Sequence, residues 1–190
     1  AEVFGYGRNF TIYDSGDSRA LIKRLVKETE ADVLGFTPAS VGGKISRLKN
    51  ELLDADAYAR QANFSDPKEA MFVELFRRYQ DALTRANAFD FDDLIGQTVH
   101  LFRAFPHVAE LYRHRFKHVL VDEYQDTNHA QYALVRELTK EIHGQRGADL
   151  TVVGDSDQSI YAFRGADIRN ITEFERDYPG AKVVLLEQNY

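Results

Sequence analysis

The sequence has no cysteine among its 190 residues and only 4 prolines. Without cysteine, the chain can form neither a disulfide framework nor a thiolate metal site. It also has no early apolar run that would serve as a signal peptide or a membrane span, so we expect a cytoplasmic protein without a membrane partner. The net charge of −6 argues against a basic coat over the whole surface, although a local patch could still bind a nucleic acid strand.

A phosphate-binding loop of the form Gly-x-x-x-x-Gly-Lys-Ser/Thr is also missing. The one Gly-Lys pair is Gly43-Lys44, but Pro38 stands where the first glycine should be, and Ile45 stands where a hydroxyl is needed. The glycines near the start fail the dinucleotide fingerprint because Phe10 occupies its last glycine position. These residues therefore contain no loop that would cradle a triphosphate.

What the sequence does contain is enough apolar material for a core, at 44% hydrophobic residues. It opens without an initiator methionine and stops just after an apolar run at 182–186. We therefore expect a fragment of a longer protein.

The first half of the sequence is predicted to be helical after one short strand at 10–13. Helix caps are indicated by Asp14 with Asp17, by Thr37-Pro38 and by Asp66-Pro67. The helix after Asp66 carries an apolar stripe made of Phe72, Leu75, Phe76, Tyr79 and Leu83.

Near residue 89 the pattern changes. Asp90 with Asp93 predicts a new helix start, and a stripe follows at Phe91, Leu94, Ile95, Thr98 and Phe102. Strands at 118–121, 150–153 and 182–186 then alternate with helices around 131–142 and 168–174. Such alternation is typical of an α/β fold with a parallel sheet and right-handed crossovers.

Acidic residues follow two of these strands. Asp122 and Glu123 come directly after the strand at 118–121, and Asp155 with Gln158 follows the strand at 150–153. Exposed acids after a strand are common, but two neighbouring strand ends that carry carboxylates and an amide favour a nucleotide site at one edge of the sheet.

Two aromatic side chains and an arginine lie close together after this edge, at Tyr161, Phe163 and Arg164. Both rings could belong to the core. The alternative is a platform on which the bases of a single strand stack.

Three stretches together carry a family resemblance: Val-Asp-Glu-Tyr-Gln-Asp-Thr-Asn at 121–128, Val-Gly-Asp-Ser-Asp-Gln-Ser-Ile-Tyr-Ala-Phe-Arg-Gly-Ala-Asp at 153–167, and Leu-Glu-Gln-Asn-Tyr at 186–190. In this order they resemble successive motifs of the UvrD/PcrA/Rep DNA helicases of superfamily 1. The resemblance implies a partial RecA-like P-loop NTPase sheet with an all-helical insertion. It also implies an ATP-driven motor that moves 3′ to 5′ on single-stranded DNA and unwinds duplex DNA.

The resemblance also implies roles for single residues. Asp122 would bind the Mg²⁺ of MgATP, and Glu123 would activate the attacking water. Gln158 would contact the γ-phosphate, Arg164 would couple the nucleotide and DNA sites, and the aromatic ring of Tyr190 would stack on adenine.

The same resemblance assigns DNA stacking to Tyr161 and Phe163. Many relatives carry Trp where Phe163 stands, and Phe keeps the stacking face without the indole N–H. DNA, ATP and DNA-repair accessory proteins are the partners that the family suggests.

By the resemblance, residues 1–88 form the helical insertion called 1B, with the end of a 1A segment at the start, and residues 89–190 form the second half of motor domain 1A. The fragment alone is expected to be inactive, because the family's phosphate loop would lie before Ala1. Two alternatives stay open: the motor part of a helicase-nuclease subunit, and a non-catalytic DNA-binding module that keeps the acidic edge.

Overall fold

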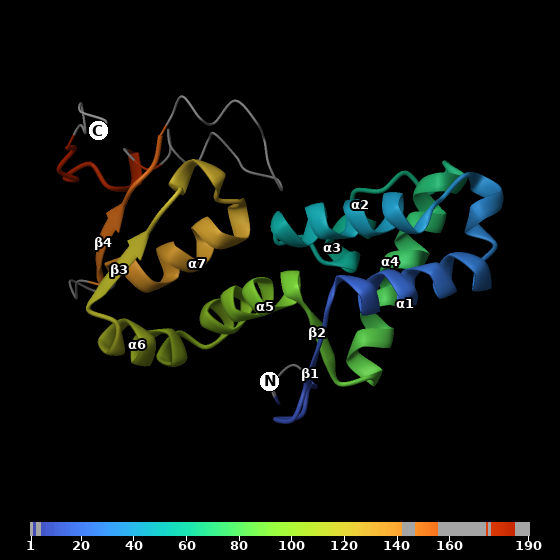
Figure 1. Cartoon of the computed structure of the whole chain (residues 1–190), viewed down its shortest axis with the longest axis horizontal. Helices are drawn as coiled ribbons and strands as arrows, with labels where there is room; N and C mark the ends of the chain where they lie inside the picture. Colours follow the sequence, from blue (N-terminus) through green and yellow to red (C-terminus); the bar gives the residue numbers. More distant parts are fainter. Residues whose placement is uncertain (1, 3–4, 142–146, 156–173, 175, 185–190) are drawn as a thin grey trace.

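The computed structural model describes residues 2, 5–141, 147–155, 174 and 176–184. Within this part of the chain no helix has both the length and the apolar character needed to cross a membrane. Figure 1 shows a helical part, which holds α1 to α4, beside a smaller α/β part, which holds β3, β4 and α7. The helix α5 extends from one part toward the other (Figure 1).

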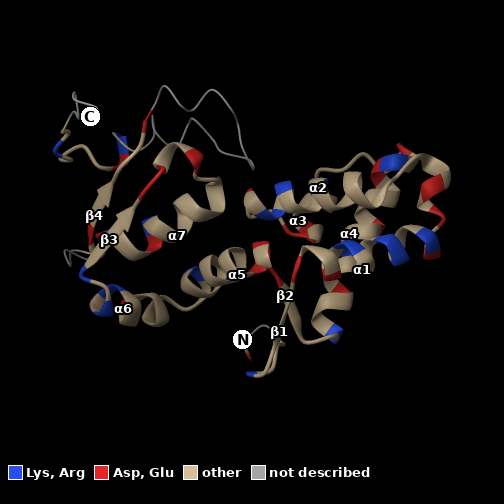
Figure 2. Cartoon of the chain, in the orientation of Figure 1, with Lys and Arg blue, Asp and Glu red and all other residues tan. Residues whose placement is uncertain are grey.

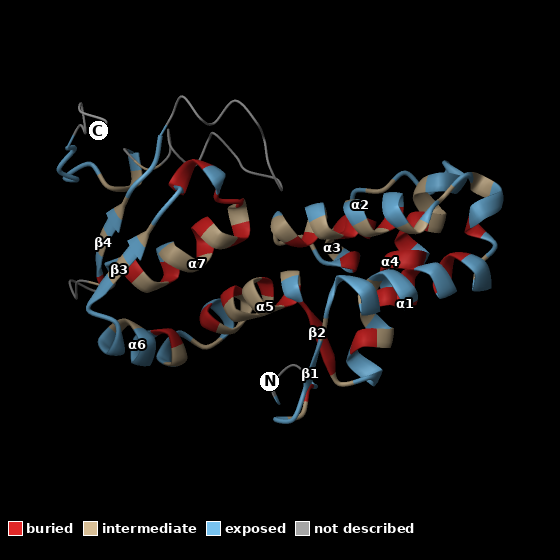
Figure 3. Cartoon of the chain, in the orientation of Figure 1, coloured by how far each residue is buried: buried red, intermediate tan, exposed pale blue. Residues whose placement is uncertain are grey.

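The helical part packs around its longest helix. Its elements are α1 (Ser15–Glu28), the 3-10 turn η2 (Ala31–Leu34), α2 (Pro38–Asn50), α3 (Ala55–Ala59) and α4 (Pro67–Arg85). The predicted stripe on α4 is fully confirmed, because all five of its side chains are buried: Phe72, Leu75, Phe76, Tyr79 and Leu83. Figure 3 shows buried residues, in red, along the faces that α1, α2 and α4 turn toward one another.

The predicted helix starts are confirmed as well. Asp14, Thr37 and Asp66 are the N-caps of α1, α2 and α4, and each accepts a hydrogen bond from a backbone N–H of the first turn. A side-chain oxygen at this position satisfies a helix N–H that has no partner within the helix. Local sequence therefore determines where these helices begin.

A two-stranded parallel sheet brackets the helical part. The strand β1 (Thr11–Tyr13) precedes α1, and β2 (Ala88–Asp90) follows α4. The register pairs Thr11 with Ala88 and Tyr13 with Asp90. The sequence did not predict β2, since a strand of three residues that ends on Asp90, the N-cap of α5, is too short to show an alternating pattern. The pairing brings the chain back beside the point where it entered the helical part.

The second part alternates helices and strands, as expected for an α/β fold. It contains α5 (Phe91–Ala104), α6 (Pro106–Arg115), β3 (His118–Val121), the 3-10 turn η3 (Tyr124–Asp126), α7 (His129–Thr139) and β4 (Asp149–Val152). The strands β3 and β4 are parallel, with Val121 beside Val152, which confirms the predicted parallel pairing. Their residues are all exposed or half-buried, and Leu120 is 76% exposed.

Two predictions about this part are wrong at some of their residues. The described residues of the third predicted strand, 182–184, form no strand, and Val183 and Val184 are 73% and 66% exposed, since no described strand lies beside them. The predicted stripe of α5 is only partly confirmed: Phe102 is buried, and Leu94, Ile95 and Thr98 are half-buried. Phe91 is 55% exposed, whereas Asp93, Gly96 and Val99 face the interior. The reason is that Asp93 is drawn inward by a buried cation from α2.

Candidate functional site

The loops after β3 and β4 run side by side. Beyond the last paired residues, the N–H of Val153 donates to the carbonyl of Val121 at 2.8 Å. The N–H of Tyr124 then donates to the carbonyl of Val153 at 2.9 Å. The two strand ends therefore meet at one edge of the sheet, as the sequence predicts, and Figure 2 shows acidic residues at both ends.

Asp122 and Glu123 are both exposed at this edge. The N–H of Glu123 donates to Asp122 Oδ1 at 2.9 Å. Glu123 has a φ of +49°, in the left-handed region that residues other than glycine rarely adopt. Such strain costs on the order of 1–3 kcal/mol and is concentrated at functional sites. The backbone conformation of Glu123 is therefore one that a glutamate does not favour by itself, so the surrounding contacts must stabilise it.

Gln125 connects the two strand ends, and sequence reasoning missed it. Its side chain is 1% exposed. Its Nε2 donates to Glu123 Oε2 at 2.6 Å, and its Oε1 accepts from the N–H of Asp155 at 3.0 Å. The only sequence signal was an amide two residues after a carboxylate. Gln125 thus fixes the Glu123 side chain relative to the loop that follows β4.

Gly154 makes this close approach possible. A Cβ added at this position would lie 2.7 Å from Gln125 Oε1 and 3.3 Å from the backbone nitrogen of Tyr124. The first distance is too short for any carbon contact, so a side chain here would push Gln125 away from Asp155. The close packing of Gly154 against the loop that follows β3 therefore explains why this position needs a glycine.

The Mg²⁺ expected at Asp122 is compatible with this geometry. No group of three or more potential metal ligands occurs among the described residues. Protein-bound Mg²⁺ commonly takes one or two carboxylates and fills its other positions with water and substrate phosphates. Asp122, exposed at the end of β3, is a suitable single ligand of this kind.

The other predicted site residues lie outside the described residues. These are Gln158, Tyr161, Phe163, Arg164 and Tyr190. Of the predicted constellation, the structure therefore brings together the acids after β3 and the start of the loop after β4.

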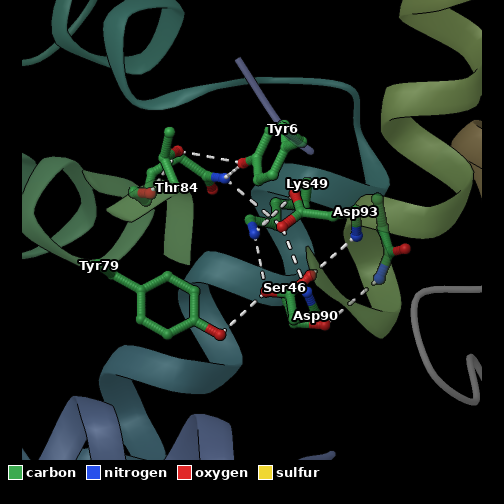
Figure 4. A network of polar contacts seen from close by, with 9 residues as sticks. Tyr6, Ser46, Lys49, Tyr79, Thr84, Asp90 and Asp93 are labelled. Carbon is green, nitrogen blue, oxygen red and sulfur yellow. Dashed lines mark hydrogen bonds and ion pairs between the residues drawn. The ribbon is translucent and has the colours of Figure 1, made fainter. Parts of the chain in front are cut away.

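A second polar cluster lies between α2, α4 and the start of α5. Lys49 Nζ lies 2.7 Å from Asp90 Oδ2 and 2.9 Å from Asp93 Oδ1, and the exposed fractions of the three side chains are 7%, 8% and 4%. The Tyr79 hydroxyl also donates to Asp90 Oδ2 at 2.9 Å. Figure 4 shows this network, with Tyr6 and Thr84 at its margin. The cluster joins the helical part to the segment that leads into the α/β part.

Burial raises the pKa of several of these groups. Desolvation raises the pKa of Asp93, and the nearby Lys49 ammonium partly offsets this rise. Desolvation likewise raises the pKa of Asp92, against hydrogen bonds from Ser46 and Asn50. Burial also raises the pKa of the Tyr79 hydroxyl, and the Asp90 charge adds to that effect. One cation thus faces more than one buried carboxylate, so a raised carboxyl pKa is the expected response.

The UvrD/REP helicase N-terminal domain family matches residues 1–179 of the chain. The chain belongs to this helicase family. It is 52% identical over 193 residues to the ATP-dependent DNA helicase UvrD1 of Mycobacterium tuberculosis, an alignment that covers 100% of the chain and 25% of that relative. It is 46% identical over 186 residues to the ATP-dependent DNA helicase PcrA of Bacillus subtilis, covering 98% of the chain and 24% of that relative.

These matches confirm the resemblance that the motifs carried. The chain spans about a quarter of the length of the curated helicases that it matches.

Proposed function

We propose that this chain is part of an ATP-dependent 3′–5′ DNA helicase and carries the metal-binding and water-activating side of its ATP site. The observation that supports this most directly is the convergence of Asp122, Glu123 and Asp155 at one sheet edge in a chain of the UvrD/REP helicase family. In α/β sheets, ligands bind beyond the carboxyl ends of the strands. The substrates are ATP and DNA, both single-stranded and duplex.

Asp122 and Glu123 take different roles in this proposal. Asp122 would hold Mg²⁺, which neutralises charge on the phosphates when bound. Glu123 would accept a proton from the attacking water. The Gln125 amide would keep the Glu123 carboxylate pointed toward the site, since it donates to one carboxylate oxygen at 2.6 Å. Positioning and electrostatics supply most of the catalysis in this reaction class.

We assign residues 1–88 to the helical insertion and residues 89–190 to the second half of a RecA-like motor domain. The pairing of β1 with β2 supports an insertion, because it brings the chain back beside its point of entry. The exposure of Leu120 on β3 supports a larger sheet, since a central strand of a parallel sheet is normally covered on both faces. The remaining parts of the motor would cover it.

We further propose that Tyr161 and Phe163 stack on DNA bases, Gln158 senses the γ-phosphate, Arg164 couples the nucleotide and DNA sites, and Tyr190 stacks on adenine. These roles rest on the match of residues 153–167 and 186–190 to the family's motifs.

Tyr161→Ala or Phe163→Ala in the intact parent is expected to weaken binding to single-stranded DNA by about 1–3 kcal/mol, the usual contribution of one stacked base. Fluorescence anisotropy with a labelled oligonucleotide at fixed salt measures this. The control is Phe116→Ala, because Phe116 is an exposed ring at the end of α6, away from the acidic edge. An affinity unchanged in both variants would place the two rings in the core instead.

The isolated chain of 190 residues is expected to show no ATPase activity, since its sequence has no phosphate-binding loop. In P-loop NTPases that loop supplies most contacts to the triphosphate. A coupled-enzyme assay with MgATP and excess single-stranded DNA tests this. ATP turnover by the purified chain that disappears in Glu123→Gln would contradict the expectation.

A further inference from the structure

The last turn of α2 contacts both parts of the molecule. Lys49 forms ion pairs with Asp90 and Asp93, which belong to β2 and α5. The next residue, Asn50, reaches the α/β part, because its Oδ1 accepts a hydrogen bond from Asn128 Nδ2 at 3.0 Å. In Figure 1, the C-terminal end of α2 lies toward α7. A single helical turn therefore bridges the helical part and the acidic loop.

The helix cap at Asn128 fixes which side-chain atom of Asn128 faces Asn50. It is the N-cap of α7, and its Oδ1 accepts from the N–H of Gln131 at 2.9 Å. Its Nδ2 must therefore face away from the cap, toward Asn50. Asn50 must then offer its oxygen, which leaves the Asn50 amide nitrogen to contact Ser46 Oγ at 3.4 Å and to stabilise the Asp92 carboxylate. The orientation of both amides follows from the helix cap.

The loop between Glu123 and Asn128 is short and tied by its own hydrogen bonds. The N–H of Asp126 donates to the carbonyl of Glu123 at 2.8 Å, and the Thr127 hydroxyl donates to the carbonyl of Tyr124 at 2.7 Å. Asn128 is 8% exposed. Because the loop is closed by these bonds, a displacement of Asn128 would be carried to Glu123.

We propose that Asn50, in the helical part, is a positioning residue for the acidic loop 122–128. It sets where Glu123 stands and does not touch nucleotide or metal. This inference rests on the proposed function, in which Glu123 activates water. In this proposal, the rate of hydrolysis depends on how the helical part packs against the α/β part. A displacement of the helical part would change the position of Glu123 through the hydrogen bond between Asn50 and Asn128.

Asn50→Ala in the intact parent is expected to lower kcat for ATP hydrolysis by roughly fivefold or more, since small misplacements of a catalytic group have large effects on rate. The KM for ATP should change less than about twofold, because Asn50 acts on the catalytic geometry and not on nucleotide binding. Steady-state ATPase assays with saturating single-stranded DNA measure both constants.

Two variants of the same cluster serve as controls. Ser46→Ala removes the contact with Asn50 Nδ2 but leaves the Asn128 contact, so kcat should stay within about twofold of wild type. The double variant Asn50→Asp/Asp92→Asn exchanges a carboxylate and an amide between neighbouring positions. It keeps the net charge and an oxygen facing Asn128, so it should restore kcat.

A second readout does not depend on ATPase activity. In the 190-residue chain, Asn50→Ala should accelerate hydrogen exchange at the amides of Asp126 and Thr127 by roughly tenfold relative to Ser46→Ala. Unchanged exchange together with unchanged kcat would overturn the proposal. A different outcome is also informative: exchange is faster in the Asn50→Ala chain, but the wild-type intact parent hydrolyses no ATP. That outcome would support the positioning role of Asn50 and contradict the proposed function.

Discussion

Glu123→Gln in the intact parent is expected to lower the rate of ATP hydrolysis by at least about 10²-fold, the usual size of a lost general base. Nucleotide affinity should change less than about twofold. The substitution preserves the size of the side chain and leaves an oxygen that can still accept from Gln125 Nε2, which lies 2.6 Å from the Glu123 carboxylate. What it removes is the ability to take a proton from water.

This separation of binding from chemistry is the informative part of the experiment. Steady-state ATPase assays give the rate, and titration with a fluorescent nucleotide analogue gives the affinity. Glu141→Gln, the same change at an exposed acid after α7, is the matched control and should behave as wild type. Hydrolysis that survives Glu123→Gln at a similar rate would exclude Glu123 as the base and would move attention to Asp122 or Asp155.

Features that depend on neighbours in sequence were predicted well. The cap residues Asp14, Thr37 and Asp66 were identified because a capping side chain bonds to N–H groups two or three positions away. The stripe of α4 was identified because helical spacing alone defines its inner face. The parallel pairing of β3 with β4 followed from the helix between them.

Features that depend on distant partners were not predicted. Lys49 is buried because it pairs with the Asp90 carboxylate. Asp90 lies 41 positions later in the sequence, so no local pattern could indicate this pairing. The inward turn of Asp93 toward the same cation leaves Phe91 outside, although apolarity alone places Phe91 in the core. Gln125 could be recognised only once Asp155 was known to lie beside it. In each case a specific polar contact between distant segments prevailed over the local pattern.

Lys49→Met is expected to destabilise the chain by about 3–5 kcal/mol at neutral pH, the usual loss when one partner of a buried ion pair is removed. Lys49 is 7% exposed at its side chain, so solvent screens the pair little. Methionine fills most of the volume of the lysine stem, and the loss therefore reports the charge. Urea unfolding followed by circular dichroism measures it. Arg47→Met, at an exposed position of the same helix, should cost less than about 0.5 kcal/mol.

The stability lost in Lys49→Met should also depend on pH, and the ionisation of the buried carboxylates determines the direction of that dependence. Without Lys49, Asp93 would be buried with no cation to offset its desolvation, so its pKa in the folded state would lie further above that of the unfolded chain, about 3.9. A folded state that holds extra protons loses stability as pH rises. The gap between the stabilities of wild type and Lys49→Met should therefore be widest near pH 7 and should narrow toward pH 4, as the Asp93 carboxylate of the variant takes up a proton.

A third variant separates the charge from the packing. Asp90→Asn keeps an oxygen for the α5 cap, where Asp90 Oδ1 accepts from the N–H of Asp93 at 2.8 Å, but it carries no charge. Combined with Lys49→Met, it leaves Asp93 as the only acid of the former ion pairs, so the double variant should be more stable than Lys49→Met alone. If the double variant is no more stable than Lys49→Met, the loss of stability comes from contacts of the lysine stem. The buried carboxylates would then be stabilised by groups other than Lys49.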